Sequence, residues 1–552
     1  MKRWRVQRKR SEKVLDSRQI VDAILDARGF ADEDKRRDFL NPRLQNLADP
    51  LRLPDMEKAV QRVETAVQRG ERILIYSDYD VDGMTSGALL FRFLKTLGAE
   101  ASVFLPNRMT EGYGLTMAGL GCALAEGLPQ LLIALDCGTT SAQEVEFLTE
   151  RGVDVVVMDH HELPVQLPRV RALVNPQSGR DDRFLASVGL VFKFCHALLK
   201  LRGDAAIFDL KEHLDLVALG TVADLARLQD DNRILVRQGL KKMGGTNHVG
   251  LRELMSRAGV KGEPTPSTCG FILGPRLNAS GRMAHGKTGL ELLTTDDRAL
   301  ARRIAEELEL LNRKRQQIEQ AAVEEAEKWL AENFCDERDL AVVVASREWH
   351  PGVVGIVASR LAKKHHRPAV VIAIDSSGKG KGSCRSIAGC SMMDALRSCD
   401  SSLETFGGHA MAAGVELWED RVNDFRIALN GWLCQNAPRE IFQPSLDIDE
   451  ELRGQEWSEE LARALAQMEP FGCGNPAPVF VMRGAELTGE PKIFGRSHLR
   501  FSVHAEGQRV DVTAFKWGDC KPPSRTLDLA GHWEMDDYTG RPRLRMLDWA
   551  AT

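Results

Sequence analysis

Three apolar runs in the first third of the chain are candidates for buried strands, and the first of them has the length and the β-branched content of one. They cover residues 73–76 (ILIY), 131–135 (LLIAL) and 154–158 (DVVVM). The stretches between them have helical character, so the order of elements is that of parallel βαβ units. The carboxyl ends of parallel strands lie at one edge of their sheet, and binding sites form there. Side chains that follow the three runs should therefore meet in one crevice.

Acidic or imidazole side chains follow each run. They are Asp78, Asp80 and Asp82 after the first run, Asp136 after the second, and Asp159, His160 and His161 after the third. A further carboxylate, Asp224, lies in an apolar, helix-like run over residues 214–228 that Gly220 interrupts. Carboxylates packed at one strand end repel one another strongly unless a cation lies among them.

The first acidic cluster has a second interpretation. After Gly83, either Thr85 or Ser86 can cap a helix, so the aspartates could form a solvated turn that precedes it. Turns rarely carry three alternating aspartates behind a buried strand, and this favours a metal site. The expected ligands are Asp80, Asp82, Asp136, His160 and Asp224. Such a set, mostly oxygen with one imidazole, suits manganese or magnesium better than zinc, which more often binds cysteines or several histidines.

The motifs occur in the order of a known family. DYDVDG at 78–83, LDCG around Asp136, DHH at 159–161 and GTVADL at 220–225 resemble the DHH phosphoesterase superfamily. PRLNASGRM at 275–283, GGHAMAAG at 407–414 and MEPFGCGNPAPVF at 468–480 make the sequence similar to the RecJ family of bacterial exonucleases. The resemblance begins at roughly residue 40 and continues to residue 552. It implies hydrolysis of single-stranded DNA in the 5′→3′ direction, with release of 5′-mononucleotides, in DNA recombination and repair.

The same resemblance implies an α/β fold in several parts. A parallel-sheet DHH lobe is joined by a long helix to a smaller α/β DHH-associated lobe, and an OB-like β-barrel follows. The expected boundaries are 1–69 for an N-terminal helical segment, 70–290 for the DHH catalytic domain, 291–335 for the connecting helix, 336–440 for the DHH-associated substrate-binding domain and 441–552 for the OB-like nucleic-acid-binding domain.

Residue patterns agree with this outline in two places. Residues 296–333 carry an apolar stripe at helical spacing, with Thr294 or Thr295 as a possible cap and charges such as Arg315 on a face expected to be solvated. From about residue 443, short β-like runs alternate with turns, as in a small barrel. Basic and aromatic groups interleave there as on single-strand-binding surfaces, at Arg496, Arg500, Lys516 and Trp517. The alternative is a barrel whose aromatic side chains all lie in the core.

For the metal site, the resemblance implies two divalent ions, Mn²⁺ or Mg²⁺, that hydrolyse a phosphodiester. Asp80, His160 and Asp224 would bind these ions, with Asp82, Asp136 or both as bridges. Asp78 would either bind an ion or accept a hydrogen bond beside the ligands. Asp159 would orient an imidazole, the usual task of a carboxylate beside a ligand histidine. His161 would meet the scissile phosphate and stabilise the charge that develops there.

A loop over residues 106–116 holds two candidates for substrate contact. In the family this loop lies next to the DNA, where Arg108 could pair with a phosphate and Tyr113 could stack on a base. The alternative is a loop at the sheet edge with a plain surface arginine.

Two further stretches are expected to touch the substrate. Residues 274–282 are too glycine-rich for a regular helix. The family resemblance implies that this stretch lies at the substrate and holds the terminal 5′-phosphate, with Arg276, Asn278 and Arg282 as candidates. Alternatively, an arginine here joins two domains through carboxylates. In the DHH-associated lobe the candidates are Ser383, Arg385, Gly407, Gly408 and His409. The neighbouring GKGKG at 378–382 lacks the spacing of a P-loop, which excludes an ATP site of that kind.

Composition narrows the cellular setting. A net charge of −5 and a pI near 6.3 do not indicate a nucleic-acid-binding protein, so DNA contact must come from local basic surface. No stretch approaches the ~20 apolar residues that span a bilayer. The basic N-terminus lacks the apolar core of a secretory signal, and eleven cysteines without a CxxC pair suit reduced thiols. We therefore expect a cytoplasmic protein without a membrane segment.

Three other functions compete with the exonuclease. A DHH phosphoesterase acting on oligoribonucleotides, adenosine bisphosphate, cyclic dinucleotides or pyrophosphate would usually be shorter or carry membrane helices, and the barrel favours a polymer. A catalytically silent scaffold would have lost metal ligands, whereas all five expected ligands are present. A binding-only protein would not need the aspartates. We therefore expect single-stranded DNA as the partner, and the resemblance adds a single-strand-binding protein and a helicase.

Overall fold

The computed structural model describes residues 2–8, 13–108, 110–179, 185–283, 286–336, 338–495, 497–520, 522, 524–536 and 538–551. The chain divides into two compact units. The first unit comprises Asp16–Asn312 and Glu460–Pro478, and the second comprises Met1–Leu15, Arg313–Glu459 and Val479–Thr552. None of the helices within the described ranges is both long and apolar enough to cross a membrane.

A five-stranded parallel sheet forms the centre of the first unit. Its order is β3-β2-β4-β5-β6. The strands are β2 (Ile73–Ser77), β3 (Ala101–Phe104), β4 (Leu131–Leu135), β5 (Asp154–Met158) and β6 (Ala172–Val174). The three apolar runs are the three inner strands, and their predicted parallel arrangement is confirmed. Every residue of β2 and β4 is buried, because helices cover both faces of the sheet.

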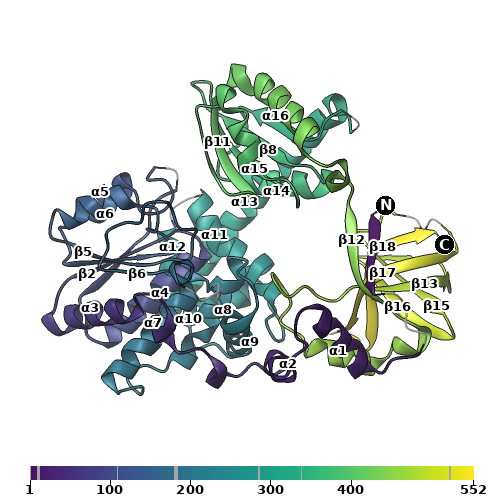
Figure 1. Cartoon of the computed structure of the whole chain (residues 1–552), viewed down its shortest axis with the longest axis horizontal. Coiled ribbons are helices and arrows are strands. Elements are labelled where there is room, and N and C mark those ends of the chain that lie inside the picture. Colours follow the sequence, from purple (N-terminus) through teal and green to yellow (C-terminus); the bar gives the residue numbers. More distant parts are fainter. Residues whose placement is uncertain are drawn as a thin grey trace. The chain divides into compact units, whose positions relative to one another are not determined.

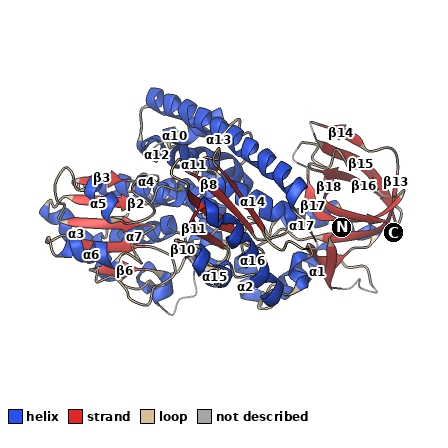
Figure 2. Ribbon diagram, turned by 90° about the horizontal axis from the view of Figure 1, so that it is seen from above, coloured by secondary structure: helices blue, strands red, loops and turns tan. Residues whose placement is uncertain are grey.

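Each face of this sheet has its own helical layer. Figure 1 shows α3 (Met56–Arg69), α4 (Val81–Thr96) and α7 (Ser187–Arg202) on one side and α5 (Met117–Ala123) and α6 (Ala142–Thr149) on the other. Successive side chains of β2 point to opposite faces of the sheet. Ile73 and Ile75 therefore pack with α3, α4 and α7, and Leu74 and Tyr76 pack with α5 and α6. Figure 2 shows the strands of this sheet in red among these blue helices.

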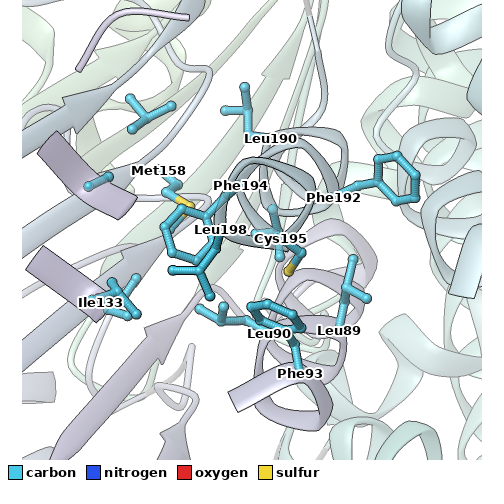
Figure 3. Close-up of a cluster of buried hydrophobic side chains, with 14 of the residues drawn as sticks. Leu89, Leu90, Phe93, Ile133, Met158, Leu190, Phe192, Phe194, Cys195 and Leu198 are labelled. Atoms are coloured by element: carbon cyan, nitrogen blue, oxygen red, sulfur yellow. The ribbon is translucent and has the colours of Figure 1, made fainter. Parts of the chain in front are cut away.

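The larger of the two cores holds α4 and α7 against the sheet. In Figure 3, Leu90 and Phe93 of α4 and Phe194 and Leu198 of α7 gather near Ile133 of β4. These side chains are all fully or almost fully buried. Since α4 starts and β4 ends beside the acidic residues, this packing fixes the framework on which those residues are held.

Further helices complete the first unit. They are α1 (Ser17–Ala27), α2 (Glu33–Leu40), α8 (Leu214–Ala223), α9 (Asp230–Met243), α10 (Val249–Arg257), the π-helical turn η5 (Thr268–Leu273), α11 (Gly274–Met283), α12 (Lys287–Thr294) and α17 (Glu459–Ala466).

Two predictions about these helices are wrong. Residues 274–282 do form a helix, because burial of Leu277 and Ala279 outweighs the low helix propensity of glycine. The run over 214–228 is also not interrupted at Gly220, which lies inside α8.

The predicted long helix is present as α13 (Arg298–Asn333). Its start is capped by Asp297 rather than by Thr294 or Thr295: the Asp297 Oδ1 atom accepts hydrogen bonds from the amides of Ala299 at 2.8 Å and Leu300 at 3.3 Å. The helical face expected to be solvated is partly covered. Arg315 is buried, and its guanidinium pairs with Glu319 at 2.9 Å.

The second unit contains a five-stranded mixed sheet in the order β10-β11-β9-β8-β7. Its strands are β7 (Val342–Ser346), β8 (Ala369–Ile374), β9 (Lys379–Arg385), β10 (Thr405–Gly408) and β11 (Ala412–Trp418), with helices α14 (Val354–His365), α15 (Met392–Arg397) and α16 (Val422–Asn436). The glycines of GKGKG have a packing role in β9. A Cβ at Gly380 would lie 2.7 Å from Ile372 Cγ2, and one at Gly382 would lie 2.7 Å from Val415 Cγ2.

The predicted C-terminal barrel is confirmed. The sheet that forms it contains β12 (Ser445–Glu451), β13 (Phe480–Leu487), β14 (Lys492–Phe494), β15 (His498–Ala505), β16 (Gln508–Ala514), β17 (Thr526–Met535) and β18 (Pro542–Ala551). The order is β1-β12-β13-β17-β18-β16-β15-β14, and an additional pairing of β13 with β15 closes a five-stranded barrel.

The first strand of the chain belongs to this barrel sheet, although a helical segment was expected from residue 1. Strand β1 (Arg3–Arg8) runs parallel to β12, and Figure 1 shows it in purple beside that strand. Trp4 and Val6 alternate with polar residues and pack on a small core, and the Trp4 indole donates a hydrogen bond of 2.8 Å to Asp548 Oδ2. The basic residues of this stretch obscure its period of two, which is the pattern of a strand.

Replacing Trp4 with alanine should destabilise the barrel by about 1–3 kcal/mol, because a partly buried indole and one hydrogen bond are lost. Hydrogen exchange along β12 as a function of denaturant measures this loss. Trp418→Ala is the matched control, since Trp418 is 43% exposed on β11 and its removal should cost less than about 0.5 kcal/mol. Equal effects of the two substitutions on β12 would contradict a supporting role for β1.

Candidate metal centre

The acidic turn after β2 is fixed by the start of α4. Asp80 is the N-cap residue of this helix, and its Oδ1 atom accepts a hydrogen bond of 3.1 Å from the Gly83 amide. The expected cap at Thr85 or Ser86 is wrong, because the helix has already begun there. The Thr85 hydroxyl instead donates a hydrogen bond of 2.8 Å to the Val81 carbonyl within α4.

Two glycines let three segments come together. A Cβ at Gly83 would lie 2.2 Å from the Asp78 carbonyl oxygen. A Cβ at Gly220 would lie 2.2 Å from Thr85 Oγ1 and 3.0 Å from Asp82 Oδ1. Neither position has room for a side chain, so glycine allows α8 to lie against α4 and to bring Asp224, at its end, to the other acidic residues.

Asp136 follows β4 in a left-handed backbone conformation, with a φ of 59°. A residue other than glycine keeps this conformation only where its surroundings hold it, and such positions cluster at functional sites. Here the Asp136 amide donates to the Met158 carbonyl at 3.0 Å, and its carboxylate accepts a hydrogen bond of 3.0 Å from the Ser187 hydroxyl. The neighbouring strand and the start of α7 thus hold the turn.

His160 lies at the centre of the cluster. Its Nε2 atom is 3.2 Å from Asp136 Oδ1, 3.7 Å from Asp224 Oδ2 and 3.9 Å from Asp82 Oδ2. This nitrogen is buried and has no hydrogen-bond partner among the described residues, and the same holds for both carboxylate oxygens of Asp78. Buried polar atoms without partners are rare, and a lone pair that faces three carboxylates needs a cation.

Three groups of side chains in the described part of the chain have the geometry of a metal site here. They are Asp136, His160 and His161; Asp82, His160 and Asp224; and Asp78, Asp80 and Asp136. Within each group, the potential ligand atoms all lie within 4.8 Å of one another. The structure thus brings together the five expected ligands and Asp78, and these residues could hold a metal ion.

Burial and mutual repulsion raise the pKa values of the carboxyl groups. Burial, followed by the charge of Asp80, raises the pKa of Asp82 to about 7 and the pKa of Asp78 well above its ordinary value. The pKa of Asp136 is raised by the same two causes. The pKa of Asp224 is raised to about 9 by burial and by the charge of Asp82. Without a cation, the cluster therefore retains protons at neutral pH.

The site also contains features that favour ligand binding. Burial and the neighbouring His161 lower the pKa of His160 to about 4, so its imidazole is neutral and its nitrogen can bind a metal ion. Asp82 is held by the start of α7. Its two oxygens accept hydrogen bonds from the amides of Ser187 at 2.7 Å and Val188 at 2.9 Å.

His161 is bonded through both ring nitrogens. Nδ1 lies 2.7 Å from Asp159 Oδ1, and Nε2 lies 2.8 Å from the Tyr113 hydroxyl. Burial lowers the pKa of His161, but the hydrogen bond to Asp159 outweighs it and brings the pKa to about 9, so the ring is an imidazolium at neutral pH. Asp159 also accepts hydrogen bonds from the amides of Thr139 at 3.0 Å and His160 at 2.8 Å. The imidazole that Asp159 orients is thus that of His161.

Two residues that were not predicted from the sequence hold the turn formed by Asp159, His160 and His161. The Asn175 side chain donates a hydrogen bond of 2.9 Å to the His161 carbonyl, and the Gln177 side chain donates one of 2.8 Å to the His160 carbonyl. Both follow β6, the next strand of the sheet. The rule that polar residues after parallel strands meet at one edge could have identified Asn175.

Comparison with known proteins matches three segments of the chain to described domains. They are the DHH family, N-terminal domain, at residues 72–221; the DHHA1 domain at 339–435; and the RecJ OB domain at 448–547. The single-stranded-DNA-specific exonuclease RecJ of Escherichia coli is 36% identical over 522 residues, which is 90% of either chain. The chain belongs to the RecJ family. RecJ of Bacillus subtilis is 35% identical over 100% of this chain and 71% of its own length.

Solved RecJ structures agree with this assignment. RecJ of Thermus thermophilus in complex with Mn²⁺ superimposes with a TM-score of 0.82 and 31% identity, over 100% of this chain and 80% of that one. A second structure of the same protein contains Mg²⁺ and gives a TM-score of 0.76, with 29% identity over 100% of this chain and 78% of that one. The resemblance seen in the motifs is therefore confirmed along the whole chain.

The loop predicted to touch substrate lies beside the cluster. The Arg108 guanidinium is 5.8 Å from the centre of the Tyr79 ring, which meets Tyr113 edge to face at 6.1 Å. Tyr113 in turn bonds His161, and its side chain is 56% exposed. Both predicted residues, Arg108 and Tyr113, are thus connected to the metal-site residues through neighbouring rings.

The three candidates on α11 have different surroundings. The Arg276 guanidinium is held within the first unit, with Nε 2.7 Å from Glu309 Oε2 and Nη1 2.7 Å from the Ile272 carbonyl. This resembles the alternative in which the arginine pairs with a carboxylate. Asn278 and Arg282 are half-buried on the same helix. The helix passes close to the acidic turn, since a Cβ at Gly281 would lie 3.2 Å from the Tyr79 carbonyl oxygen.

The candidates in the DHH-associated lobe belong to the second unit. Arg385 donates a hydrogen bond of 3.0 Å to the Ser383 hydroxyl, and both side chains lie at the start of α14. A Cβ at Gly355 would lie 3.1 Å from Ser383 Oγ and 3.3 Å from Arg385 Nη2. The remaining candidates, Gly407, Gly408 and His409, form the end of β10 and the turn into β11.

The barrel candidates are partly engaged in packing. The Arg500 guanidinium lies 5.0 Å from the centre of the Phe494 ring. Trp517 meets Trp549 edge to face at 5.1 Å, as in the alternative in which barrel aromatics support the fold. Lys516 follows β16 with a φ of 64°, and Arg496 lies outside the described residues.

The raised carboxyl pKa values predict how metal affinity changes with pH. A cation must displace the protons that Asp82 and Asp224 hold, so the affinity for Mn²⁺ should rise by about tenfold or more for each pH unit between about 6 and 8, and more steeply below pH 7, where both groups hold a proton. A carboxyl pKa raised by folding also means that the metal-free protein loses stability as pH rises through this range. Added Mn²⁺ should therefore raise Tm more at about pH 8.5 than at about pH 6. A shift that is independent of pH would contradict protonation of the cluster.

Proposed function

We propose that this chain is a metal-dependent exonuclease that hydrolyses single-stranded DNA in the 5′→3′ direction and releases 5′-mononucleotides, in DNA recombination and repair. The observation that carries the proposal is the buried His160 nitrogen, which faces three carboxylates without a hydrogen-bond partner in the described chain. The family supports the substrate, because relatives that match most of the chain are named single-stranded-DNA-specific exonucleases.

Two divalent ions, Mn²⁺ or Mg²⁺, fit the cluster. Asp82, Asp136 or both would bridge the ions. Asp136 shares one ligand group with Asp78 and Asp80, and Asp82 shares another with His160 and Asp224. Asp78 shares a group with Asp80 and has two unpartnered oxygens within the described chain, which supports a direct role as ligand. When bound, the ions lower the pKa of a water molecule and offset the charge of the phosphate.

The chain's own groups position the phosphate. The His161 imidazolium carries an N–H at Nε2, which now points to the Tyr113 hydroxyl, and a phosphate oxygen would replace this hydroxyl as the acceptor. Asp159 keeps His161 charged and oriented through its hydrogen bond to Nδ1. The imidazolium would thus stabilise the negative charge that develops as the phosphodiester is hydrolysed.

Each unit by itself contains candidates for contact with DNA. The proposed contacts are Arg108, Tyr113, Asn278 and Arg282 in the first unit and Ser383, Arg385, Gly407, Gly408 and His409 in the second. Arg276 is a weaker candidate because Glu309 already binds its guanidinium. A single-strand-binding protein and a helicase are proposed as partners from the family resemblance. All eleven cysteines are free thiols, which supports the proposal that the protein is located in the cytoplasm.

The reaction is tested with pure protein, Mn²⁺ and end-labelled DNA. Single-stranded and duplex substrates, with and without a 5′-phosphate, are compared in the presence and absence of a chelator. Release of labelled mononucleotide from the 5′ end of single strands supports the proposal. Hydrolysis of short RNA or cyclic dinucleotides but not of DNA would indicate a DHH phosphoesterase with a different substrate. No hydrolysis of any substrate would indicate a scaffold protein without catalytic activity.

Asp136→Asn should lower the cleavage rate by about 10³-fold or more, because the metal site supplies several kcal/mol of transition-state stabilisation. Binding of single-stranded DNA, measured by fluorescence anisotropy in a chelator, should change little. Asp215→Asn is the matched control: Asp215 is a fully buried carboxylate on α8 that accepts a hydrogen bond from Thr246 away from the cluster. Near wild-type cleavage by the Asp136 variant would overturn the metal assignment.

A further inference from the structure

A loop that is distant in sequence contacts the segment directly after Asp224. This loop, residues 468–475, is here termed the brace loop. It belongs to the first unit, whereas the chain before Glu460 and after Pro478 belongs to the second. The Leu228 amide donates a hydrogen bond of 2.8 Å to the Cys473 carbonyl, and the Gln229 side chain donates one of 3.0 Å to the Gly474 carbonyl.

A buried asparagine holds the brace loop together. Asn475 is 1% exposed, and its Nδ2 atom donates hydrogen bonds of 2.8 Å to the Met468 carbonyl and 2.9 Å to the Pro470 carbonyl. Its Oδ1 atom accepts one of 3.0 Å from Arg28. Backbone hydrogen bonds between Gly472 and Asn475 close the turn. The loop therefore has a defined shape that depends on one side chain.

A buried arginine fastens the brace loop to α9, the helix that follows Leu228. The Arg233 side chain is 2% exposed and donates hydrogen bonds to the carbonyls of Glu469 at 2.8 Å, Pro470 at 3.4 Å and Phe39 at 2.8 Å. The brace loop also packs closely on Leu228, since a Cβ at Gly472 would lie 2.7 Å from Leu228 Cδ1. The brace loop and residues 227–233 thus form one packed assembly.

Between Asp224 and Leu228 the backbone is strained. α8 ends in a turn in which the amides of Leu225 and Ala226 donate to the carbonyls of Val222 and Thr221, each at 3.2 Å. Leu225 has a φ of 60° in this turn, a position that usually holds glycine. Its side chain is 71% exposed, so burial of the leucine does not compensate for the strain. The next anchored residue is Leu228, which is 2% exposed and bonded to the brace loop.

We propose that the brace loop is a positioning element for Asp224. By fixing Leu228, it holds the left-handed turn at Leu225 and thereby keeps the Asp224 carboxylate 3.7 Å from His160 Nε2. The brace loop acts through the backbone of residues 225–228, to which it is bonded at the Leu228 amide. This inference rests on the proposed function, because it takes Asp224 as a metal ligand.

The test uses the full chain and Mn²⁺ alone, without DNA. Asn475→Ala should weaken Mn²⁺ binding, measured by electron paramagnetic resonance, by about 10-fold, the effect typical of residues that orient a ligand. Hydrogen exchange at the Leu228 amide should become faster. Asn430→Ala is the matched control, because the Asn430 Oδ1 atom accepts hydrogen bonds from the amides of Leu340 at 2.6 Å and Ala341 at 3.0 Å in the second unit. This control should leave Mn²⁺ affinity unchanged.

A rescue variant separates positioning from general loss of stability. Leu225→Gly removes the strain at the turn, so the double variant with Asn475→Ala should recover most of the lost Mn²⁺ affinity. If Asn475→Ala does not fold, Gly472→Ala replaces it, since its single methyl group would press on the end of the Leu228 side chain.

Two outcomes would overturn the inference. Wild-type Mn²⁺ affinity in either folded brace-loop variant, together with weakened binding in Asp224→Asn, would overturn the positioning role and leave the proposed function intact. Unchanged Mn²⁺ binding in Asp224→Asn would overturn the metal assignment and the positioning role together.

Discussion

The repulsion among carboxylates brought into one buried site is the constraint on which the first unit depends. Asp78, Asp82, Asp136 and Asp224 lie where burial and the charges of neighbours raise the pKa of each. The fold compensates in part through the amides at the start of α7 and through a neutral His160. A divalent cation would provide the remaining compensation, so protein stability and metal binding are coupled through the same carboxylates.

The ligands could be predicted because each one follows an element that has a clear apolar pattern. The sequences of β2, β4 and β5 have the pattern of buried strands, and a parallel sheet places their ends together, so Asp78, Asp136 and His160 could be grouped from the sequence alone. The barrel and the long helix were also visible, since periods of two and of about 3.6 residues are local properties of the sequence.

The parts that could not be predicted depend on contacts between distant residues. The Ser187 amide holds Asp82, yet backbone groups leave no trace in the residue type. Arg276 had the composition of a phosphate-binding residue, but only the packing of α11 places Glu309 beside it. The caps at Asp80 and Asp297 were missed because neighbouring threonines and serines are equally good candidates by propensity.

The pairing of β1 with β12 has a consequence for how the protein is made. Arg3 leaves the ribosome before its partner Ser445, which is synthesised more than 400 residues later. At typical rates of synthesis the first strand must wait roughly 20 to 90 s without its neighbour. Its basic residues, Arg3, Arg5 and Arg8, suit this interval, because charge on an unpaired strand opposes association with other chains. Strand β1 can therefore join the barrel sheet only after residues 16–312 of the first unit have been synthesised.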